Sequence, residues 1–184
     1  MESTRDVSAM YFAADAAFAI SEKFSVGAGF EYLSGNSMKD PDKKDQAFKP
    51  LYGTNHKFNG WMDYFYVGSF MNSVGLIDIY VPLSFKKDKF SAALIPHYFM
   101  AANDIYLIDM AGIGKDYNAS LGTEIDLELG YKVAKNATVK VGYSQMFATE
   151  SMQVLKGGNY ENTNNWAWVM IDFKPTFFKS GKDN

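Results

Sequence analysis

Three carboxylates alternate along one short segment, LGTEIDLELGY at 121–131, where Glu124, Asp126 and Glu128 are separated by aliphatic residues. If this segment is a strand, the three side chains share one face and lie roughly 6.5–7 Å apart. Such a row could supply the general acid and base of a hydrolysis. Because any polar strand face has this spacing, we favour a role in setting the ion preference of a water-filled lumen.

Few other side chains in the sequence are candidates for catalysis or for binding a ligand or metal. Asn55 and His56, with Asp63, could contact a ligand or a metal, but such residues more commonly organise a turn, with the aspartate accepting backbone hydrogen bonds. His97 lies far away in the sequence, and two distant histidines do not make a metal motif. Cysteine is absent, which excludes thiolate sites. We therefore predict no catalytic residue, no metal and no cofactor, and we expect that the protein is not an enzyme.

Two tryptophans, Trp166 and Trp168, stand two positions apart near the end of the chain, on the same side as the polar residues of their segment. Two interpretations remain open for them. Their rings could stack on sugar rings, or they could pack on the neighbouring segment 150–163.

The elements that must position these residues are strands, because apolar and polar residues alternate with a period of two. Seven such segments are present, at 14–20, 24–32, 77–85, 90–101, 121–131, 139–147 and 167–173. Each strand is expected to span roughly 10–14 residues, whereas strands of soluble proteins average about 5–6 and a bilayer-crossing strand needs about 9–11. A short helix over 13–19 is a competing interpretation, since that segment is rich in alanine.

The connections alternate strictly between short and long. Tight turns are predicted at 21–23, 86–89 and 134–137, and long connections at 33–73, 102–118 and 149–165. Outer-membrane barrels show this pattern because one rim carries turns and the other carries loops. Within the long loop 35–73, the Asn59-Gly60 pair signals a hairpin, so an eighth strand at 61–68 is an alternative to a structured element folded against or into the barrel mouth.

The alternation places charges of both signs on the face opposite the aliphatic residues. The residues that we expect to face a lumen are Glu31, Asp78, Glu124, Asp126, Glu128, Lys140, Asp172 and Lys174. The aliphatic sides end in aromatic residues, as in the aromatic girdles of membrane barrels. In a soluble barrel or sandwich the same pattern would place the apolar side on a core. We favour the membrane interpretation.

Composition limits the partners and the cellular location that can be expected for this protein. The net charge is −3 and Arg5 is the only arginine, so we expect no nucleic-acid partner. No window of about 18 apolar residues predicts a transmembrane helix. The opening MESTRDVSAMYF lacks the pattern of a signal peptide, which leaves a cytoplasmic protein or a mature or truncated piece of a longer one.

Several of these segments resemble the alginate-export family of outer-membrane β-barrels, in its Bacteroidetes-type branch. The resemblance is carried by FKPLYGTNHKFNGWMDYF (48–65), VGAGFEYLSGN (26–36), HYFMAA (97–102), GTEIDLELGYK (122–132), GYSQMFATESM (142–152) and NWAWVMIDFKPTFFK (165–179). It covers nearly the whole chain but only the carboxyl-terminal part of a family member. It implies a fragment of a larger barrel with an even number of strands.

Together these observations predict an all-β, antiparallel up-and-down transmembrane β-barrel, or the carboxyl-terminal segment of one, with about 7–8 strands in a single domain over 1–184. The expected function is a porin-like channel of the bacterial outer membrane that passes hydrophilic solutes, with anionic oligosaccharides among the candidates. Its expected partners are outer-membrane lipid, the solute and the barrel-assembly machinery. The alternatives are a structural or adhesin-type barrel without transport, and a soluble β-barrel that binds a ligand.

Overall fold

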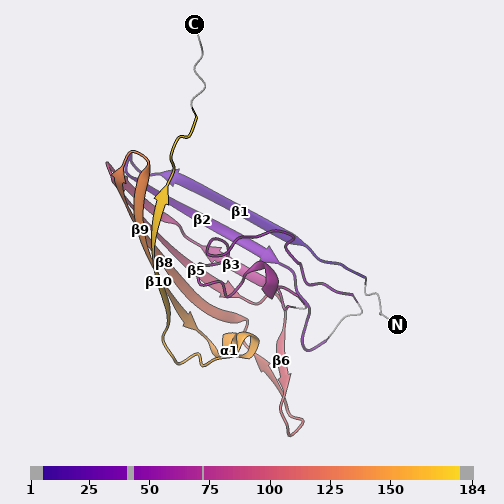
Figure 1. Cartoon of the computed structure of the whole chain (residues 1–184). Coiled ribbons are helices and arrows are strands. Elements are labelled where there is room, and N and C mark those ends of the chain that lie inside the picture. The colour runs from indigo at the N-terminus through magenta and orange to yellow at the C-terminus, as the bar shows by residue number, and fades with distance from the viewer. Residues whose placement is uncertain (1–5, 41–43, 72, 179–184) are drawn as a thin grey trace.

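The computed structural model describes residues 6–40, 44–71 and 73–178 and is an antiparallel, all-β structure, as predicted. One curved sheet forms the body of the molecule (Figure 1). Its strands are β1 (Tyr11–Ala19), β2 (Phe24–Leu33), β3 (Leu76–Tyr80), β4 (Leu83–Lys87), β5 (Phe90–Met100), β8 (Ser120–Ala134), β9 (Ala137–Ala148) and β10 (Asn164–Phe173). The remaining elements are η1 (Val67–Ser69), the hairpin of β6 (Ile105–Ile108) and β7 (Gly114–Tyr117), and α1 (Glu150–Lys156).

The eight strands of the sheet fill seven positions, because β3 and β4 follow one another between β2 and β5. The break between them falls at Val81 and Pro82, where proline has no N–H group to donate to the ladder. Cross-strand bonds still flank the break, since Gly27 N donates to Pro82 O at 2.8 Å and Val81 N donates to Pro96 O at 3.1 Å. The seven predicted strands, including a single one over 77–85, are therefore confirmed in outline.

The sheet is open. Its order runs β1-β2-β3-β5-β8-β9-β10, and among the described residues no pairing joins β1 to β10. Segment 59–70 contains only the short helix η1, so the alternative of an eighth strand there is wrong. The alternative of a helix over 13–19 is also wrong, because these residues pair with β2 along the whole length of β1.

Short and long connections lie at opposite ends of the sheet, with the turns at the upper left of Figure 1 and the loops at the lower right. The loops carry two elements that the sequence did not predict. One is the β6–β7 hairpin within 101–119. The other is α1, whose first turn is capped by Thr149, because its hydroxyl accepts a hydrogen bond from Met152 N at 3.3 Å. In the described parts of the chain, no helix has the length and apolarity needed to cross a membrane.

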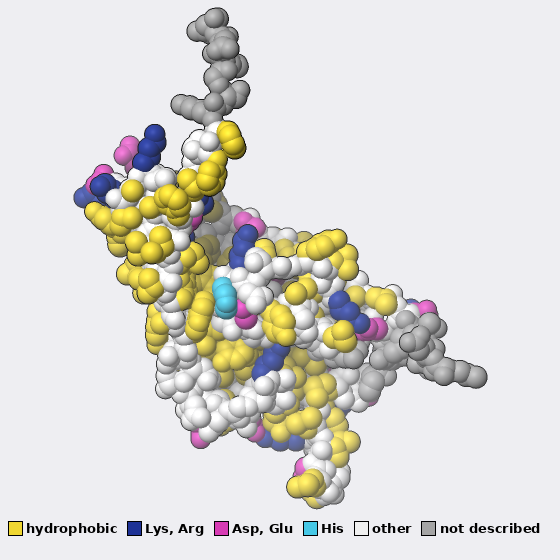
Figure 2. Space-filling view, in the orientation of Figure 1, with side chains coloured by type: hydrophobic (Ala, Val, Ile, Leu, Met, Phe, Trp, Pro, Cys, Tyr) yellow, Lys and Arg dark blue, Asp and Glu magenta, His cyan; other side chains and the backbone are white. Residues whose placement is uncertain are grey.

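The convex face of the sheet is apolar and uncovered. Figure 2 shows hydrophobic side chains gathered along the flank at the left, with charged side chains at its turn-end tip. The exposed apolar side chains of this face include Phe12, Phe18, Ile79, Leu83, Leu94, Tyr98, Tyr131, Val141, Tyr143, Phe147, Val169, Ile171 and Phe173, with 37–74% of their surface accessible. A large exposed patch of this kind marks an interaction surface for protein or membrane.

The concave face is covered at its loop end by the chain itself. The described residues of 34–40, 44–71 and 73–75, together with α1, fold over it and enclose a small hydrophobic core. The core is made of Leu33, Phe65, Phe70, Val74, Leu76, Phe99, Ala101, Ile105, Leu121, Met146 and Met152. Burying a side chain such as Phe99 or Leu76, each 0% exposed, contributes about 2–3 kcal/mol, so this core contributes to holding the long loop on the sheet.

Asp45 fastens the outer part of the long loop to the segment before β1. Ser8 N donates to Asp45 O at 2.9 Å, and Asp45 N donates to Asp6 O at 2.8 Å. The carboxylate accepts from Lys49 Nζ at 2.5 Å and from Asn36 Nδ2 at 3.0 Å. These two donors, Lys49 first, lower the pKa of Asp45 to about 2, because they stabilise its charged form.

This carboxylate makes a pH-dependent contribution to stability. Its pKa is lower in the folded state, so the contribution is present above the unfolded pKa of about 4 and is lost as the pH falls through about 2. We expect Asp45→Asn to lower the free energy of unfolding by about 1 kcal/mol at pH 7, and the two proteins to converge as the pH falls below about 2. Denaturant unfolding across this range measures the difference, and a difference that stays constant with pH would contradict the assignment.

Candidate functional site

The tip of the long loop, residues 56–63, is a tight turn with an unusual backbone. Four of its residues have positive φ: His56 (55°), Asn59 (53°), Gly60 (82°) and Asp63 (57°). At Gly60 a side chain would also be blocked, since a Cβ atom there would lie 2.7 Å from the Glu124 carboxylate. The Asn59-Gly60 pair, which predicted a hairpin turn, therefore serves to bring the backbone against the sheet.

Asp63 and His56 close this turn. Asp63 Oδ1 accepts a hydrogen bond from His56 N at 2.7 Å, and Oδ2 lies 3.0 Å from His56 Nδ1. The same ring nitrogen donates to Trp61 O at 2.8 Å. Asn55, next to them, is exposed. The predicted cluster of Asn55, His56 and Asp63 is thus brought together, and His56 and Asp63 bond within the loop.

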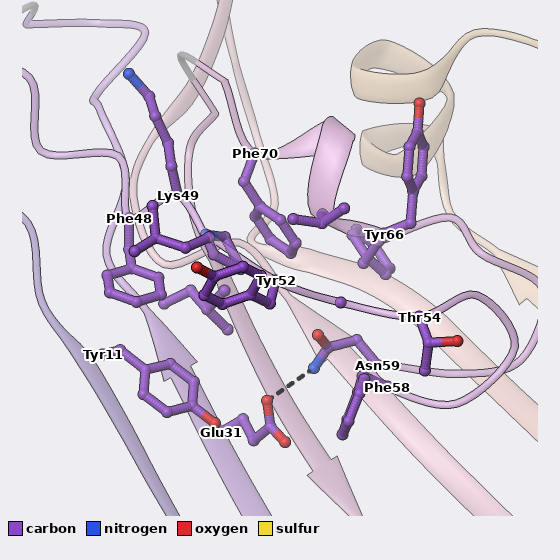
Figure 3. Close-up of a pocket in the computed structure, with 16 residues that line it drawn as sticks. Tyr11, Glu31, Phe48, Lys49, Tyr52, Thr54, Phe58, Asn59, Tyr66 and Phe70 are labelled. Atoms are coloured by element: carbon purple, nitrogen blue, oxygen red, sulfur yellow. Dashed lines mark hydrogen bonds between the residues drawn. The ribbon is translucent and has the colours of Figure 1, made fainter.

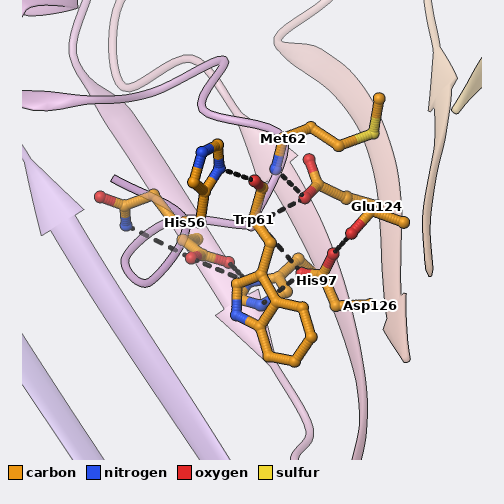
Figure 4. Close-up of polar contacts among 9 residues, drawn as sticks. His56, Trp61, Met62, His97, Glu124 and Asp126 are labelled. Carbon is orange, nitrogen blue, oxygen red and sulfur yellow. Dashed lines mark hydrogen bonds and ion pairs between the residues drawn. The ribbon is translucent and has the colours of Figure 1, made fainter. Parts of the chain in front are cut away.

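Two buried carboxylates on β8 hold the loop tip by its backbone (Figure 4). Glu124 Oε1 accepts from Trp61 N at 2.6 Å and from Met62 N at 2.8 Å. Asp126 Oδ2 accepts from Trp61 N at 3.2 Å. Both carboxylates are 0% exposed, so each N–H group replaces a water molecule that the carboxylate lost on burial.

A chain of polar contacts continues from this point across the concave face. Asp126 accepts a hydrogen bond from the Ser144 hydroxyl on β9. His97 on β5 joins two carboxylates, since its Nδ1 lies 2.9 Å from Asp78 Oδ1 and its Nε2 lies 3.8 Å from Asp126 Oδ2. Glu124 Oε2 is buried and has no hydrogen-bond partner. The cluster therefore gathers three acidic side chains, those of Asp78, Glu124 and Asp126, around one histidine.

Asn59 extends the cluster towards β2. Its Nδ2 donates to Glu31 Oε2 at 3.1 Å and to Asp78 Oδ2 at 3.3 Å. One loop side chain thus bridges carboxylates on β2 and β3, while the loop backbone bonds to carboxylates on β8. As a result the loop tip is fixed to opposite sides of the concave face.

The predicted lumen-facing residues divide into two groups. Glu31, Asp78, Glu124 and Asp126 gather beneath the loop. The others form ion pairs nearer the turn end. Glu128 accepts from Lys140 Nζ at 2.8 Å, and Lys174 Nζ lies 2.7 Å from Asp172 Oδ2.

The tryptophans of β10 meet the loop tip from the side. The His56 ring stacks on Trp166 with centroids 4.3 Å apart, and Trp166 lies 6.2 Å from Trp168. Trp168 lies over Gly142, where a Cβ atom would come within 2.2 Å of its ring. Both tryptophans are half-buried on the concave side, and the contact of Trp166 is with His56 of the loop tip.

The polar contacts of this cluster hold the loop tip against the sheet. The carboxylates of 124 and 126 accept hydrogen bonds from the loop backbone, and His97 lies between two carboxylates. No group of side chains among the described residues has the geometry of a metal site. Sequence reasoning missed the donors Trp61 N and Met62 N, because backbone groups carry no residue-specific signal.

Comparison with models of known protein families and with curated proteins finds no match. The resemblance to the alginate-export family stays a prediction.

The bonds from Trp61 N and Met62 N to Glu124 generate a prediction about loop stability. Glu124→Ala removes the acceptor of two hydrogen bonds, which contribute together about 2 kcal/mol. We expect the amides of Trp61 and Met62 to exchange with solvent about thirtyfold faster, as hydrogen–deuterium exchange would measure.

Two variants sharpen this measurement. Glu124→Gln keeps one acceptor oxygen and should accelerate exchange less than the alanine variant. Glu128→Ala, on the same face of β8, removes a partner of Lys140 and not of the loop, so it serves as the matched control. Unchanged exchange at Trp61 and Met62 in Glu124→Ala would show that the loop is held by its hydrophobic core alone.

Proposed function

We propose that this chain forms part of the wall, and the constricting loop, of a porin-like channel in the bacterial outer membrane that passes hydrophilic solutes. One observation carries the proposal: a single sheet presents an uncovered apolar face on its convex side and polar, charged side chains on its concave side. In a membrane the convex face would lie against lipid and the concave face would border water.

The lengths and ends of the strands support the same interpretation. β2, β5, β8, β9 and β10 have 10–15 residues each, enough to cross a hydrocarbon layer at a tilt. Aromatic side chains, among them Tyr131, Phe147 and Phe173, lie exposed towards the ends of the convex face. Such rings are favoured at the interface between lipid and water.

A soluble protein with this sheet would need a second layer over the convex face. The described residues supply none, since the loops and α1 lie on the concave side. The edges of the sheet, β1 and β10, also require partners in lipid, where an unpaired backbone group costs several kcal/mol. The proposed channel therefore includes further strands at both edges.

The charges of the concave face favour neutral or cationic solutes over the anionic oligosaccharides that the family resemblance implies. Carboxylates outnumber lysines among the described side chains that point to this side. The acids are Asp15, Glu31, Asp78, Glu124, Asp126, Glu128 and Asp172, and the lysines are Lys86, Lys132, Lys140 and Lys174. A lumen with this excess attracts cations.

The second candidate function is a structural barrel without transport. The hydrophobic core beneath the long loop favours it, because that core fills the loop-end half of the concave face. Small barrels are commonly filled by their own side chains.

Membrane contact can be tested with adjacent residues of β10 that face opposite sides. Val169 lies on the convex face and is 74% exposed, and Met170 lies on the concave face and is 50% exposed. In lipid we expect Val169→Arg to lower the free energy of unfolding by about 2–4 kcal/mol and Met170→Arg to lower it much less. Equal effects within about 0.5 kcal/mol, as for exposed positions in water, would contradict membrane contact.

Transport can be tested by conductance. Protein extracted from membranes in mild detergent, with any chains that accompany it, is fused with planar bilayers. We expect single-channel steps with a preference for cations, and larger steps for Glu124→Ala, because the loop is then less firmly held across the lumen. Inserted protein that gives no steps with either the wild type or this variant would favour the structural barrel.

A further inference from the structure

A cavity of about 510 Å³ lies between the long loop and the concave side of β1 and β2 (Figure 3). Its size falls in the range of small-molecule sites, which is about 300–1,000 Å³. Seven of its sixteen lining residues are aromatic: Tyr11, Phe48, Tyr52, Phe58, Phe65, Tyr66 and Phe70. It adjoins the carboxylate cluster at β8, with which it shares Glu31 and Asn59.

Glu31 supplies a carboxylate to this aromatic cavity. Figure 3 shows it between the rings of Tyr11 and Phe58, with Tyr52 above. Its Oε2 accepts from Asn59 Nδ2 at 3.1 Å, and within the described parts of the chain no lysine, arginine or histidine forms an ion pair with it.

The lysine nearest to the cavity does not neutralise this carboxylate. Lys49 belongs to the lining, but its Nζ bonds to Asp45 Oδ2 at 2.5 Å and points away from Glu31 in Figure 3. The other neighbour of Asn59 is Asp78, a second acid. Asp78 lies 2.9 Å from His97 Nδ1 and does not line the cavity, so Glu31 is the carboxylate at its floor and has no ion-pair partner among the described side chains.

From this juxtaposition we propose that the cavity binds a small organic cation with an alkylated ammonium group. The faces of aromatic rings carry partial negative charge and attract such cations. Glu31 contributes the opposite formal charge at the floor. The alkyl groups of the ligand would lie against Tyr11, Tyr52 and Phe58.

The lining argues against a neutral sugar. A sugar needs several hydrogen-bonding partners for its hydroxyl groups, whereas the polar uncharged side chains lining this cavity are those of Thr54, Asn59 and the tyrosines. Asn59 also already donates to two carboxylates. A cation needs only charge and aromatic surface, which the cavity supplies.

This inference goes beyond the proposed channel, because the cavity depends on the packing of residues 48–70 against β1 and β2 and not on a conducting lumen. Occupation of the cavity would place a cation beside Asn59, which holds the loop tip. The site thus belongs to the loop that the channel proposal assigns to the constriction.

The test is calorimetric titration of the full chain with choline and with tetramethylammonium. A polyoxyethylene detergent is suitable, since it carries neither a sugar nor an ammonium group. We expect one saturable site for both cations, no comparable binding of glucose, and at least tenfold weaker binding to Glu31→Gln. The matched control, Glu128→Gln, removes a concave-face carboxylate outside the cavity and should bind as the wild type does.

Circular dichroism establishes that each variant keeps its strand content. If Glu31→Gln does not fold, Tyr52→Ala decides the matter, because that side chain is 91% exposed and its loss should weaken binding severalfold without unfolding the chain. Absence of cation binding to the folded wild type, equal binding to Glu31→Gln, or equally tight binding of glucose would overturn the proposal. Conductance would be unaffected by that failure, so the two proposals can fail separately.

Discussion

The structure depends on a set of hydrogen bonds between the backbone of one loop and two carboxylates buried on β8. Trp61 N and Met62 N donate to Glu124, and Trp61 N also reaches Asp126. Without these donors, two acids would be buried on the concave face at a cost of several kcal/mol each. Without the acids, the loop tip would leave its own N–H groups unpaired against the sheet. The loop N–H groups therefore satisfy the buried carboxylates, and the carboxylates satisfy the loop N–H groups.

The strained backbone of the loop tip follows from this constraint. Four positive φ angles within residues 56–63 turn successive N–H groups towards the same acceptor. His56 and Asp63 hold that conformation from within the loop. The hydrophobic core between Phe65, Phe70 and Phe99 then fixes the following segment, so polar and apolar contacts act on consecutive stretches of the same loop.

Period-two alternation was sufficient to predict the strands and their order along the chain, because each segment has one clear apolar side. It also predicted the alternation of turns and loops, since charged or polar residues separate the strands. It did not predict α1, which has seven residues, or the β6–β7 hairpin, whose strands have four residues each. Such short elements carry weak periodicity.

The contacts of the candidate site were harder to predict from the sequence than the strands were. The alternation places Glu124 and Asp126 on one face, but it does not distinguish a carboxylate that faces water from one that faces a backbone N–H group. The aromatic cavity was also missed, because Tyr11 and Phe58 are distant in the sequence and only the folded loop brings them to the same carboxylate. The resemblance identified residues 48–65 as a distinctive segment without indicating what they contact.

The two edges of the open sheet have a consequence for any assembly that closes it. With seven positions in strict antiparallel succession, β1 and β10 point the same way, both from the loop rim to the turn rim. If a second copy of the chain, related by rotation about the axis of the ring, closed the sheet, its β1 would lie parallel to β10 of the first copy. To keep every ladder antiparallel, the missing arc must contribute an odd number of strands, which makes the completed ring even.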